Sequence, residues 1–437
     1  MIKILRETEI NLTEILKRNE AGKAPEEVVA DVVKNVRENG DESLYRYTLK
    51  FDGADLKSSG FLVSEKEKKA AVEMVEEEFI SLLKRAAENI KAFHSHQVQN
   101  GFITTGEKGI VMGQKVTPLQ RVGIYVPGGK AAYPSTVLMD AIPAKIAGVK
   151  EIVMVTPPDE KGNVNPAILA AAKVAGVDKI YKVGGAQAIA ALAYGTESIA
   201  PVDKIVGPGN AYVAEAKRQV YGKVDIDMIA GPSEILIIAD EKATPAYVAA
   251  DLLSQAEHDE MASAVLITTS FDLAGKVAAR VEKQLESLER KEIAAASIEN
   301  NGKIIVVKEL KEALRIANML APEHLEICTE NPFDYLGLVE NAGSVFLGSH
   351  CPEVLGDYLA GTNHTLPTGG RARFSSALSV EDFVKKIQYT YYTGEAFTDV
   401  AKDVAFFAQK EGLGAHGRSA LIRLEEQQET YIELGRH

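Results

Sequence analysis

Gln255 and His258 stand three residues apart in the stretch "LLSQAEHDEMAS", residues 252–263. Side chains at this spacing share one face of a helix, where an amide oxygen and an imidazole nitrogen could hold a metal ion together. The same pair could also cap the carbonyl groups of its own helix end. The residues alone leave both interpretations open, because two ligands do not make a site.

Several other stretches contain polar groups that a simple apolar core does not require. Glu323 and His324 are adjacent in "APEHLE". The other candidates are Ser233 in "AGPSE", Asp357 in "LGDYLAGTNHTLPTGG", and Glu411 and His416 in "EGLGAHG". No spacing rule links these stretches, so their convergence in space is not predicted from the residues themselves.

The elements that must position these groups follow an α/β pattern. Short apolar runs alternate with amphipathic segments, which is typical of βαβ units with parallel sheets. The first series is "RVGIYV", "EIVMVTP", "KIYKV" and "DKIVG", and the second is "EILIIAD", "AVLITTS", "KIIVV" and "SVFLG". The pattern predicts two doubly wound, Rossmann-like α/β units with small helical extensions at both ends. Thr244 and Pro245 predict the start of a helix that runs to about His258.

Three predicted strands end in glycine turns: "YVPGGK", "VGGAQA" and "VGPGNAY". At the carboxyl edge of a parallel sheet such turns let backbone amides approach a pyrophosphate, although they also serve as tight strand-to-helix connections. The literal GxGxxG in "GLGAHG" follows a helical stretch instead of a strand. We therefore do not interpret it as a dinucleotide-binding motif.

The predicted organisation has four parts. Residues 1–22 form a small N-terminal extension, and residues 23–124 with 235–378 form a first, discontinuous α/β domain that contains the metal and catalytic residues. Residues 125–234 form a second α/β domain with the glycine turns. Residues 379–437 form a helical tail that contributes to a partner's site. Residues 64–97 predict one long amphipathic helix.

Composition narrows the class of protein. The chain has 437 residues, of which 46% are apolar, with a net charge of −13, two cysteines and no tryptophan. These values favour a multidomain globular protein and argue against partners such as nucleic acid or a membrane. Two cysteines in so long a chain, with no secretory signal pattern, predict a cytoplasmic location. Any metal would use His, Asp, Glu or amide ligands.

With these motifs in view, the chain resembles the histidinol dehydrogenases over nearly its whole length. The matching motifs are "YVPGG", "VGGAQAIAALAYGTES", "KIVGPGNAYVAEAKRQV", "DMIAGPSE", "ATPAYVAADLLSQAEHD", "APEHLE", "GDYLAGTNHTLPT" and "GAHGR", in that order. The resemblance implies a homodimer with shared active sites and one zinc ion per subunit.

Carried over residue by residue, the resemblance assigns roles to the candidates. The implied zinc ligands are Gln255, His258, Asp357 and, from the other subunit, His416. The residues that would contact NAD are Tyr125, Gln187 and Asn210. Those that would bind substrate are Ser233, Gln255, His258, His324, Asp357, Glu411 and His416. Glu323 and His324 would be catalytic.

The implied reaction is the NAD-dependent oxidation of L-histidinol, through L-histidinal, to L-histidine at the end of histidine biosynthesis. His324 would take the alcohol proton and Glu323 would activate water. Three alternatives stay open: a related zinc and NAD dehydrogenase of another small alcohol, a thiol route to the acid through Cys351, and a catalytically silent binding protein.

Overall fold

The computed structural model describes residues 2–6, 8, 25–128 and 132–433, with the side chains of 427–433 left out. The chain divides into two compact units. Unit 1 comprises Met1–Val98 and Pro118–Phe383, and unit 2 comprises Gln99–Thr117 and Val384–His437. Within the described ranges, no helix has both the length and the apolar character needed to span a bilayer.

One parallel sheet of unit 1 has five strands in the order β6-β5-β4-β7-β8. Its strands are β4 (Arg121–Tyr125), β5 (Glu151–Thr156), β6 (Lys179–Lys182), β7 (Lys204–Val206) and β8 (Asp225–Ile226). The chain runs outward from β4 through β5 to β6 and then returns to place β7 on the other side of β4. The order therefore reverses between β4 and β7, which is where open α/β sheets bind nucleotides.

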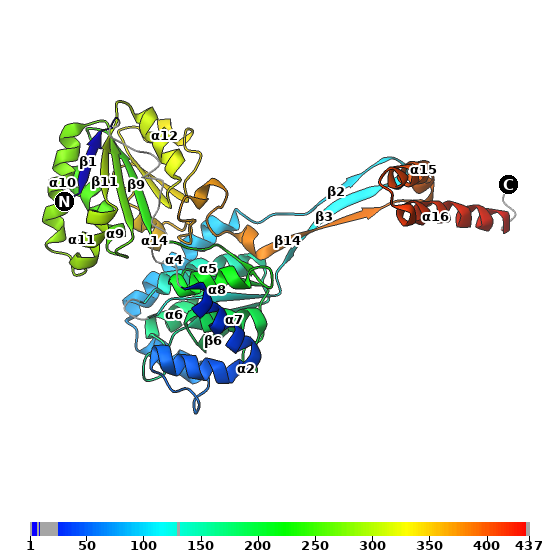
Figure 1. Ribbon diagram of the computed structural model, residues 1–437, viewed down its shortest axis with the longest axis horizontal. Helices are drawn as coiled ribbons and strands as arrows, with labels where there is room; N and C mark the ends of the chain where they lie inside the picture. The colour runs from blue at the N-terminus through cyan, green and yellow to red at the C-terminus, as the bar shows by residue number, and fades with distance from the viewer. Residues whose placement is uncertain (1, 7, 9–24, 129–131, 434–437) are drawn as a thin grey trace. The chain divides into compact units, whose positions relative to one another are not determined.

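Helices cover both faces of this sheet (Figure 1). Alternate strand residues point to opposite faces, so Val122 and Ile124 enter one core while Val153 and Val155 enter the other. The first core is covered by α3 (Glu65–Glu73), α4 (Glu77–Ser95), α5 (Pro134–Ala147) and α6 (Pro166–Ala175). The second is covered by α2 (Glu26–Asp52), α7 (Gly185–Tyr194) and α8 (Ala211–Val220).

The other parallel sheet of unit 1 has six strands in the order β1-β11-β10-β9-β12-β13. Its strands are β1 (Lys3–Arg6), β9 (Glu234–Ala239), β10 (Ser263–Thr268), β11 (Lys303–Val306), β12 (His324–Cys328) and β13 (Ser344–Leu347). One face packs on α9 (Pro245–Ala256), α10 (Phe271–Leu285) and α11 (Lys291–Asn300), and the other on α12 (Leu310–Leu320). The prediction of two doubly wound units is confirmed.

The structure divides unit 1 differently from the sequence-based boundaries. Those boundaries placed residues 23–124 with the metal and catalytic domain, yet α2, α3 and α4 pack on the five-stranded sheet, and β4 is one of its strands. Among the described residues before position 125, only the short strand β1 belongs to the six-stranded sheet, and it lies in the predicted N-terminal extension. An amphipathic helix carries no signal for which of two sheets its apolar stripe will cover. Residues 9–22 of the predicted extension lie outside the described residues.

Unit 2 combines a three-stranded sheet with two helices. The sheet has the order β14-β3-β2, formed by β2 (Phe102–Thr105), β3 (Val111–Pro118) and β14 (Val384–Tyr391). The chain then continues into α15 (Gly394–Lys410) and α16 (Gly414–Glu433), which pack on each other. The tail predicted as helical from residue 379 thus contains a strand as well. The single helix predicted over 64–97 is two helices, α3 and α4.

Candidate active site

Glu234 holds Glu323 and His324 through its own peptide group. The backbone N–H of Glu234 donates to Oε2 of Glu323 at 2.8 Å, and its carbonyl oxygen lies 2.9 Å from Nδ1 of His324. Glu234 begins β9 and His324 begins the neighbouring strand β12, so strand pairing sets this contact. A carbonyl oxygen can only accept, so Nδ1 carries the hydrogen and Nε2 keeps a free lone pair.

Burial sets the protonation of this pair in opposite directions. Burial lowers the pKa of His324 to about 4, so its imidazole is neutral at physiological pH. Burial also raises the pKa of Glu323 well above its usual range, and the nearby Glu234, Asp357 and Glu353 carboxylates raise it further. At physiological pH His324 is therefore in its neutral form with a lone pair on Nε2, whereas Glu323 becomes a base only when it loses its own proton.

His324 belongs to a cluster that could hold a metal ion. The ligand atoms of His324, Glu353 and Asp357 all lie within 4.8 Å of one another. Glu353 immediately precedes α14 (Val354–Tyr358) and Asp357 lies four residues later, so one turn of helix presents both carboxylates. Oε1 of Glu353 accepts a hydrogen bond from Ser254, while its buried Oε2 has no hydrogen-bond partner.

The charges around this cluster favour a cation. Burial and, to a lesser extent, the Glu353 carboxylate together raise the pKa of Asp357 to about 7. The carboxylates of Glu234, Asp357 and Glu353 also raise the pKa of Glu323, so the charges around the cluster are negative. Buried carboxylates are stable in the ionised state only when paired or bound to a metal, so the oxygen and nitrogen donors here suit a divalent ion such as zinc.

Gln255 and His258 lie at the end of α9. The helix ends at Ala256, two residues earlier than predicted, and the N–H of His258 donates to the carbonyl oxygen of Gln255 at 3.2 Å. The Gln255 side chain is buried, whereas His258 is exposed. The negative charge of Glu353 acts on His258, which places the two side chains within electrostatic range of each other.

Further buried carboxyl groups lie behind Glu353. Oε1 of Glu326, in the middle of β12, accepts the backbone N–H of Glu353 at 2.8 Å. Glu326 and Asp251 also share a side-chain hydrogen bond, and burial raises the pKa of both groups, that of Asp251 to about 6. Sequence reasoning missed Glu353, Glu326 and Asp251. The spacing of four between Glu353 and Asp357 is the one signal that could have identified Glu353.

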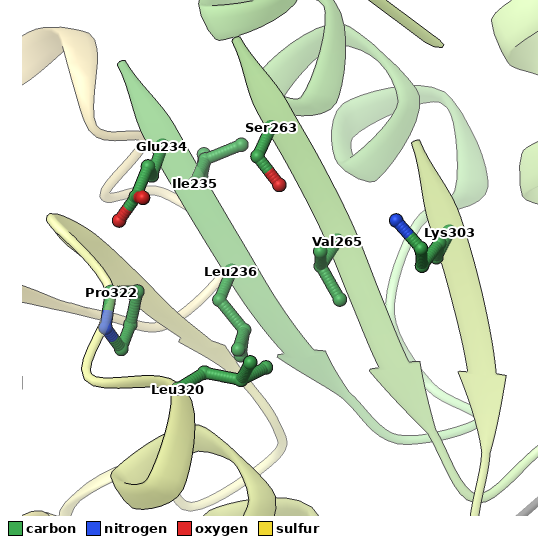
Figure 2. A pocket seen from close by; sticks show the side chains of 8 residues that line it. All are labelled: Glu234, Ile235, Leu236, Ser263, Val265, Lys303, Leu320 and Pro322. Carbon is green, nitrogen blue, oxygen red and sulfur yellow. The ribbon is translucent and has the colours of Figure 1, made fainter. Parts of the chain in front are cut away.

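A small pocket lies at the amino end of the six-stranded sheet (Figure 2). Its lining residues are Glu234, Ile235, Leu236, Ser263, Val265, Lys303, Leu320 and Pro322. Glu234 lines the pocket with its side chain while its backbone holds the Glu323–His324 pair. The catalytic candidates therefore stand at the amino edge of this sheet, not at the carboxyl edge where α/β sheets usually bind ligands. Ser233, just before β9, is half-buried.

The three candidates for cofactor contact lie at the carboxyl edge of the five-stranded sheet. Tyr125 ends β4, and its hydroxyl accepts the N–H of Gly185 at 3.1 Å. Gln187 is buried in the first turn of α7. Asn210 is exposed and caps α8, with its Oδ1 accepting from the backbone N–H groups of Tyr212 and Val213. Residues 129–131 of the first glycine turn lie outside the described residues.

The turn before Asn210 requires glycine. Gly207 has a φ of 109°, and a Cβ atom there would lie 2.2 Å from the carbonyl oxygen of Tyr125. Only glycine allows the backbone after β7 to approach β4 so closely. This close approach occurs at the point where the strand order reverses, which is where open α/β sheets bind nucleotides.

The last two candidates belong to unit 2. Glu411 caps the carboxyl end of α15, and His416 lies in the first turn of α16. Both residues are exposed within unit 2. The segment Gly412–Gly417 follows a helix, so it lacks the strand that a dinucleotide-binding motif needs.

Two doubly wound α/β units, a buried acid–base pair and glycine turns at a sheet switch point define an α/β oxidoreductase. The family model described as histidinol dehydrogenase matches residues 16–424. Histidinol dehydrogenase from Clostridium acetobutylicum is 58% identical, covering 92% of this chain and 94% of that protein. Its counterpart from Bacillus cereus is 56% identical, with 98% and 97% covered.

A solved structure agrees with these relatives. The crystal structure of histidinol dehydrogenase from Elizabethkingia anophelis is 40% identical, with a TM-score of 0.92, over 98% of this chain and 99% of that chain. The chain belongs to the histidinol dehydrogenase family and is an NAD-dependent oxidoreductase of histidine biosynthesis.

Proposed function

We propose that the chain oxidises L-histidinol through L-histidinal to L-histidine at the site formed by Glu323, His324 and Asp357. The observation that carries this proposal is the contact of the Glu234 peptide group with both Glu323 and His324, beside the Glu353 and Asp357 carboxylates. A base, a water-activating carboxylate and a cation-binding cluster in one place suit oxidation of an alcohol to an acid.

In the first half of the reaction, His324 accepts the proton of the carbinol hydroxyl on Nε2. The hydrogen bond from Nδ1 to Glu234 fixes the imidazole and stabilises the imidazolium that forms. NAD, when bound, accepts the hydride from the carbinol carbon. Tyr125, Gln187 and Asn210 hold the cofactor at the carboxyl edge of the five-stranded sheet.

In the second half, Glu323 removes a proton from water as the water adds to the aldehyde. The resulting hydrate loses a second hydride to a second NAD, which leaves the carboxylate. The sum is one alcohol, one water and two NAD consumed, and one carboxylate, two NADH and three protons formed. Burial raises the pKa of Glu323, so a cation in the site would favour the ionised form that this step needs.

One zinc ion per subunit would be held by Gln255, His258, Asp357 and His416 of the partner subunit. The unpartnered Oε2 of Glu353 and the negative surroundings of Asp357 support a cation at this place. When bound, zinc would hold the amine and imidazole of the substrate and so fix its carbinol carbon. Ser233 and Glu411 of the partner subunit would also contact the substrate.

A homodimer with shared active sites fits the surface of unit 2. Unit 2 is small, yet it exposes several large apolar side chains. They include Phe102, Ile103, Tyr391, Phe406 and Phe407. Apolar patches of this kind mark protein interfaces, and a second copy of the chain is the partner we propose. We also propose a cytoplasmic location, to which the two free cysteines are suited.

Steady-state kinetics with a panel of alcohols tests this function. The zinc-loaded protein should reduce NAD with L-histidinol at a kcat/KM at least about 100-fold above that for amino alcohols that lack the imidazole, since those lose contacts that the site is built to make. A higher kcat/KM for another small alcohol would favour a related dehydrogenase instead.

A further inference from the structure

The loop that follows Asp357 is bonded to helix α5 by three successive residues. Asn363 donates from Nδ2 to the carbonyl oxygen of Met139 at 2.7 Å. Nε2 of His364 lies 3.2 Å from the hydroxyl of Thr136, and the hydroxyl of Thr365 donates to Oδ1 of Asp140 at 2.9 Å. A loop from the catalytic side is thereby fixed to a helix of the five-stranded sheet.

This loop also lies close to the candidate metal cluster. Nδ1 of His364 is 3.7 Å from Oδ1 of Asp357. Asn363 and Thr365, on either side of His364, are buried. Their hydrogen bonds to α5 therefore restrict where His364 can sit against Asp357.

The other oxygen of Asp140 faces the turn Gly207–Asn210, which we call the cofactor turn. A Cβ atom built on Gly207 would lie 2.8 Å from Oδ2 of Asp140, so the space beside this glycine is occupied by the carboxyl group. Asp140 is fully buried, and its Oδ2 has no hydrogen-bond partner. Any influence of this oxygen on Gly207 therefore acts through packing.

Two more buried groups hold the same glycine. The N–H of Gly207 donates to Oδ2 of Asp227 at 2.8 Å, and its carbonyl oxygen accepts from Nζ of Lys217 at 2.7 Å. Lys217 and Asp227 form a buried ion pair at 2.6 Å. Breaking a buried pair of this kind is costly, so the backbone of Gly207 has little freedom.

We propose that Asp140 is a positioning residue that couples the loop behind Asp357 to the cofactor turn Gly207–Asn210. Thr365 orients the Asp140 carboxyl through one oxygen, and the other oxygen determines how closely Gly207 can approach β4. The affinity for NAD then depends on a hydrogen bond made outside the cofactor turn. The inference rests on the proposed contact between Asn210 and NAD.

Substitutions of Thr365 test the coupling without altering either the turn or Asp140. Thr365→Val removes the hydroxyl and keeps the shape, and it should raise the dissociation constant for NAD by roughly fivefold, the effect of losing one hydrogen bond. Thr365→Ser retains the hydroxyl and should bind NAD like the wild type. Thr48→Val is the matched control, because Thr48 is equally buried and its hydroxyl has no partner.

Substitutions of Asp140 provide a second route. Burial, together with the Asp227 carboxylate, raises the pKa of Asp140 to about 8, so the side chain is neutral near pH 7 and an amide imitates it. Asp140→Asn should therefore keep NAD affinity within about twofold, whereas Asp140→Ala should weaken it at least as much as Thr365→Val does.

Isothermal titration of the full-length, zinc-loaded protein with NAD measures these constants, and thermal unfolding is recorded in parallel. Weaker NAD binding by Thr365→Val and Asp140→Ala, with the Thr48→Val control unchanged, supports the coupling. A lower melting temperature with an unchanged dissociation constant would overturn it, because the bond would then serve stability alone. If the wild type itself does not bind NAD, the proposed function fails instead of the coupling.

Discussion

Nδ1 of His324 lies 2.9 Å from the carbonyl oxygen of Glu234, so the imidazole presents Nε2 as its only lone pair. Burial lowers the pKa of this imidazole to about 4, which keeps it neutral and able to accept a proton at any physiological pH. The neighbouring Glu323 has a raised pKa and must ionise before it can act. This difference supports the proposal that the two residues act in different halves of the reaction.

Substitution of Glu323 and His324 should separate those halves. Glu323→Gln keeps the shape but cannot take a proton from water, so oxidation of supplied L-histidinal should slow by about 100-fold or more while the first hydride transfer is affected less. His324→Asn should slow the first step as well. The measurement is single-turnover NADH formation from histidinol and from histidinal.

Glu299→Gln is the control for these rates, because Glu299 is exposed on α11. If Glu323→Gln oxidised histidinal at the wild-type rate, Glu323 would not be the water-activating base. A thiol route through Cys351, which is only partly buried, would then need to be examined.

Removal of Glu353 should weaken metal binding. Glu353→Gln takes away one of the carboxylates that surround the candidate ligands, and outer carboxylates of metal sites typically contribute about 10-fold to 100-fold in affinity. Competition with a chromophoric chelator measures the zinc dissociation constant, again with Glu299→Gln as the control. Equal zinc affinity in wild type and Glu353→Gln would exclude Glu353 from the site.

Chelation of the wild type should abolish turnover while NAD still binds, because the glycine turns follow strands of the five-stranded sheet, whereas the candidate ligands lie at the end of α9, on α14 and on α16. Added zinc should then restore activity. Full turnover in metal-free protein would contradict the metal assignment altogether.

Mixed dimers test whether His416 serves the partner's site. His258→Ala and His416→Ala should each be inactive alone, and a mixture after subunit exchange should regain activity because one of the two shared sites in each heterodimer is intact. Differently tagged subunits establish that exchange has occurred. No recovery among proven heterodimers would place His416 in the site of its own subunit.

The pH dependence of stability should change in Asp140→Asn. The pKa of Asp140 is raised to about 8 from a usual value near 3.8, so its contribution to stability is fully present below the lower value and is lost as pH rises through the higher one. The amide has no such loss. Urea unfolding at pH 5.5 and pH 8.5 should show the variant gaining stability relative to the wild type at the higher pH, whereas parallel profiles would mean that Asp140 ionises normally.

The strands were predictable because four of the eight predicted apolar segments, "EILIIAD" and "AVLITTS" among them, are rich in β-branched residues. The glycine turns were predictable for a related reason, since Gly207 occupies a backbone conformation that other residues rarely adopt. Both signals come from residues that are neighbours in the sequence, so they can be recognised without knowledge of the fold.

The rest depends on contacts between distant segments. Glu326 lies within an otherwise apolar strand, and only the fold brings Glu353 to its side. The backbone contact of Glu234 with His324 leaves no signal in side-chain identity, because any residue except proline offers the same N–H and carbonyl groups at position 234. The ribbon of β2, β3 and β14 was missed because its strands bury few side chains and so lack a clear apolar alternation.

The ratio of NADH to L-histidine formed from L-histidinol is the most direct test of whether one site performs both oxidations. The structure places Glu323 and His324 side by side on the peptide group of Glu234, so if they have the proposed roles both oxidations should occur at one site. The expected result is two NADH per histidine, with no free histidinal detected in the medium. One NADH per histidinol, with the aldehyde accumulating as the product, would contradict this account.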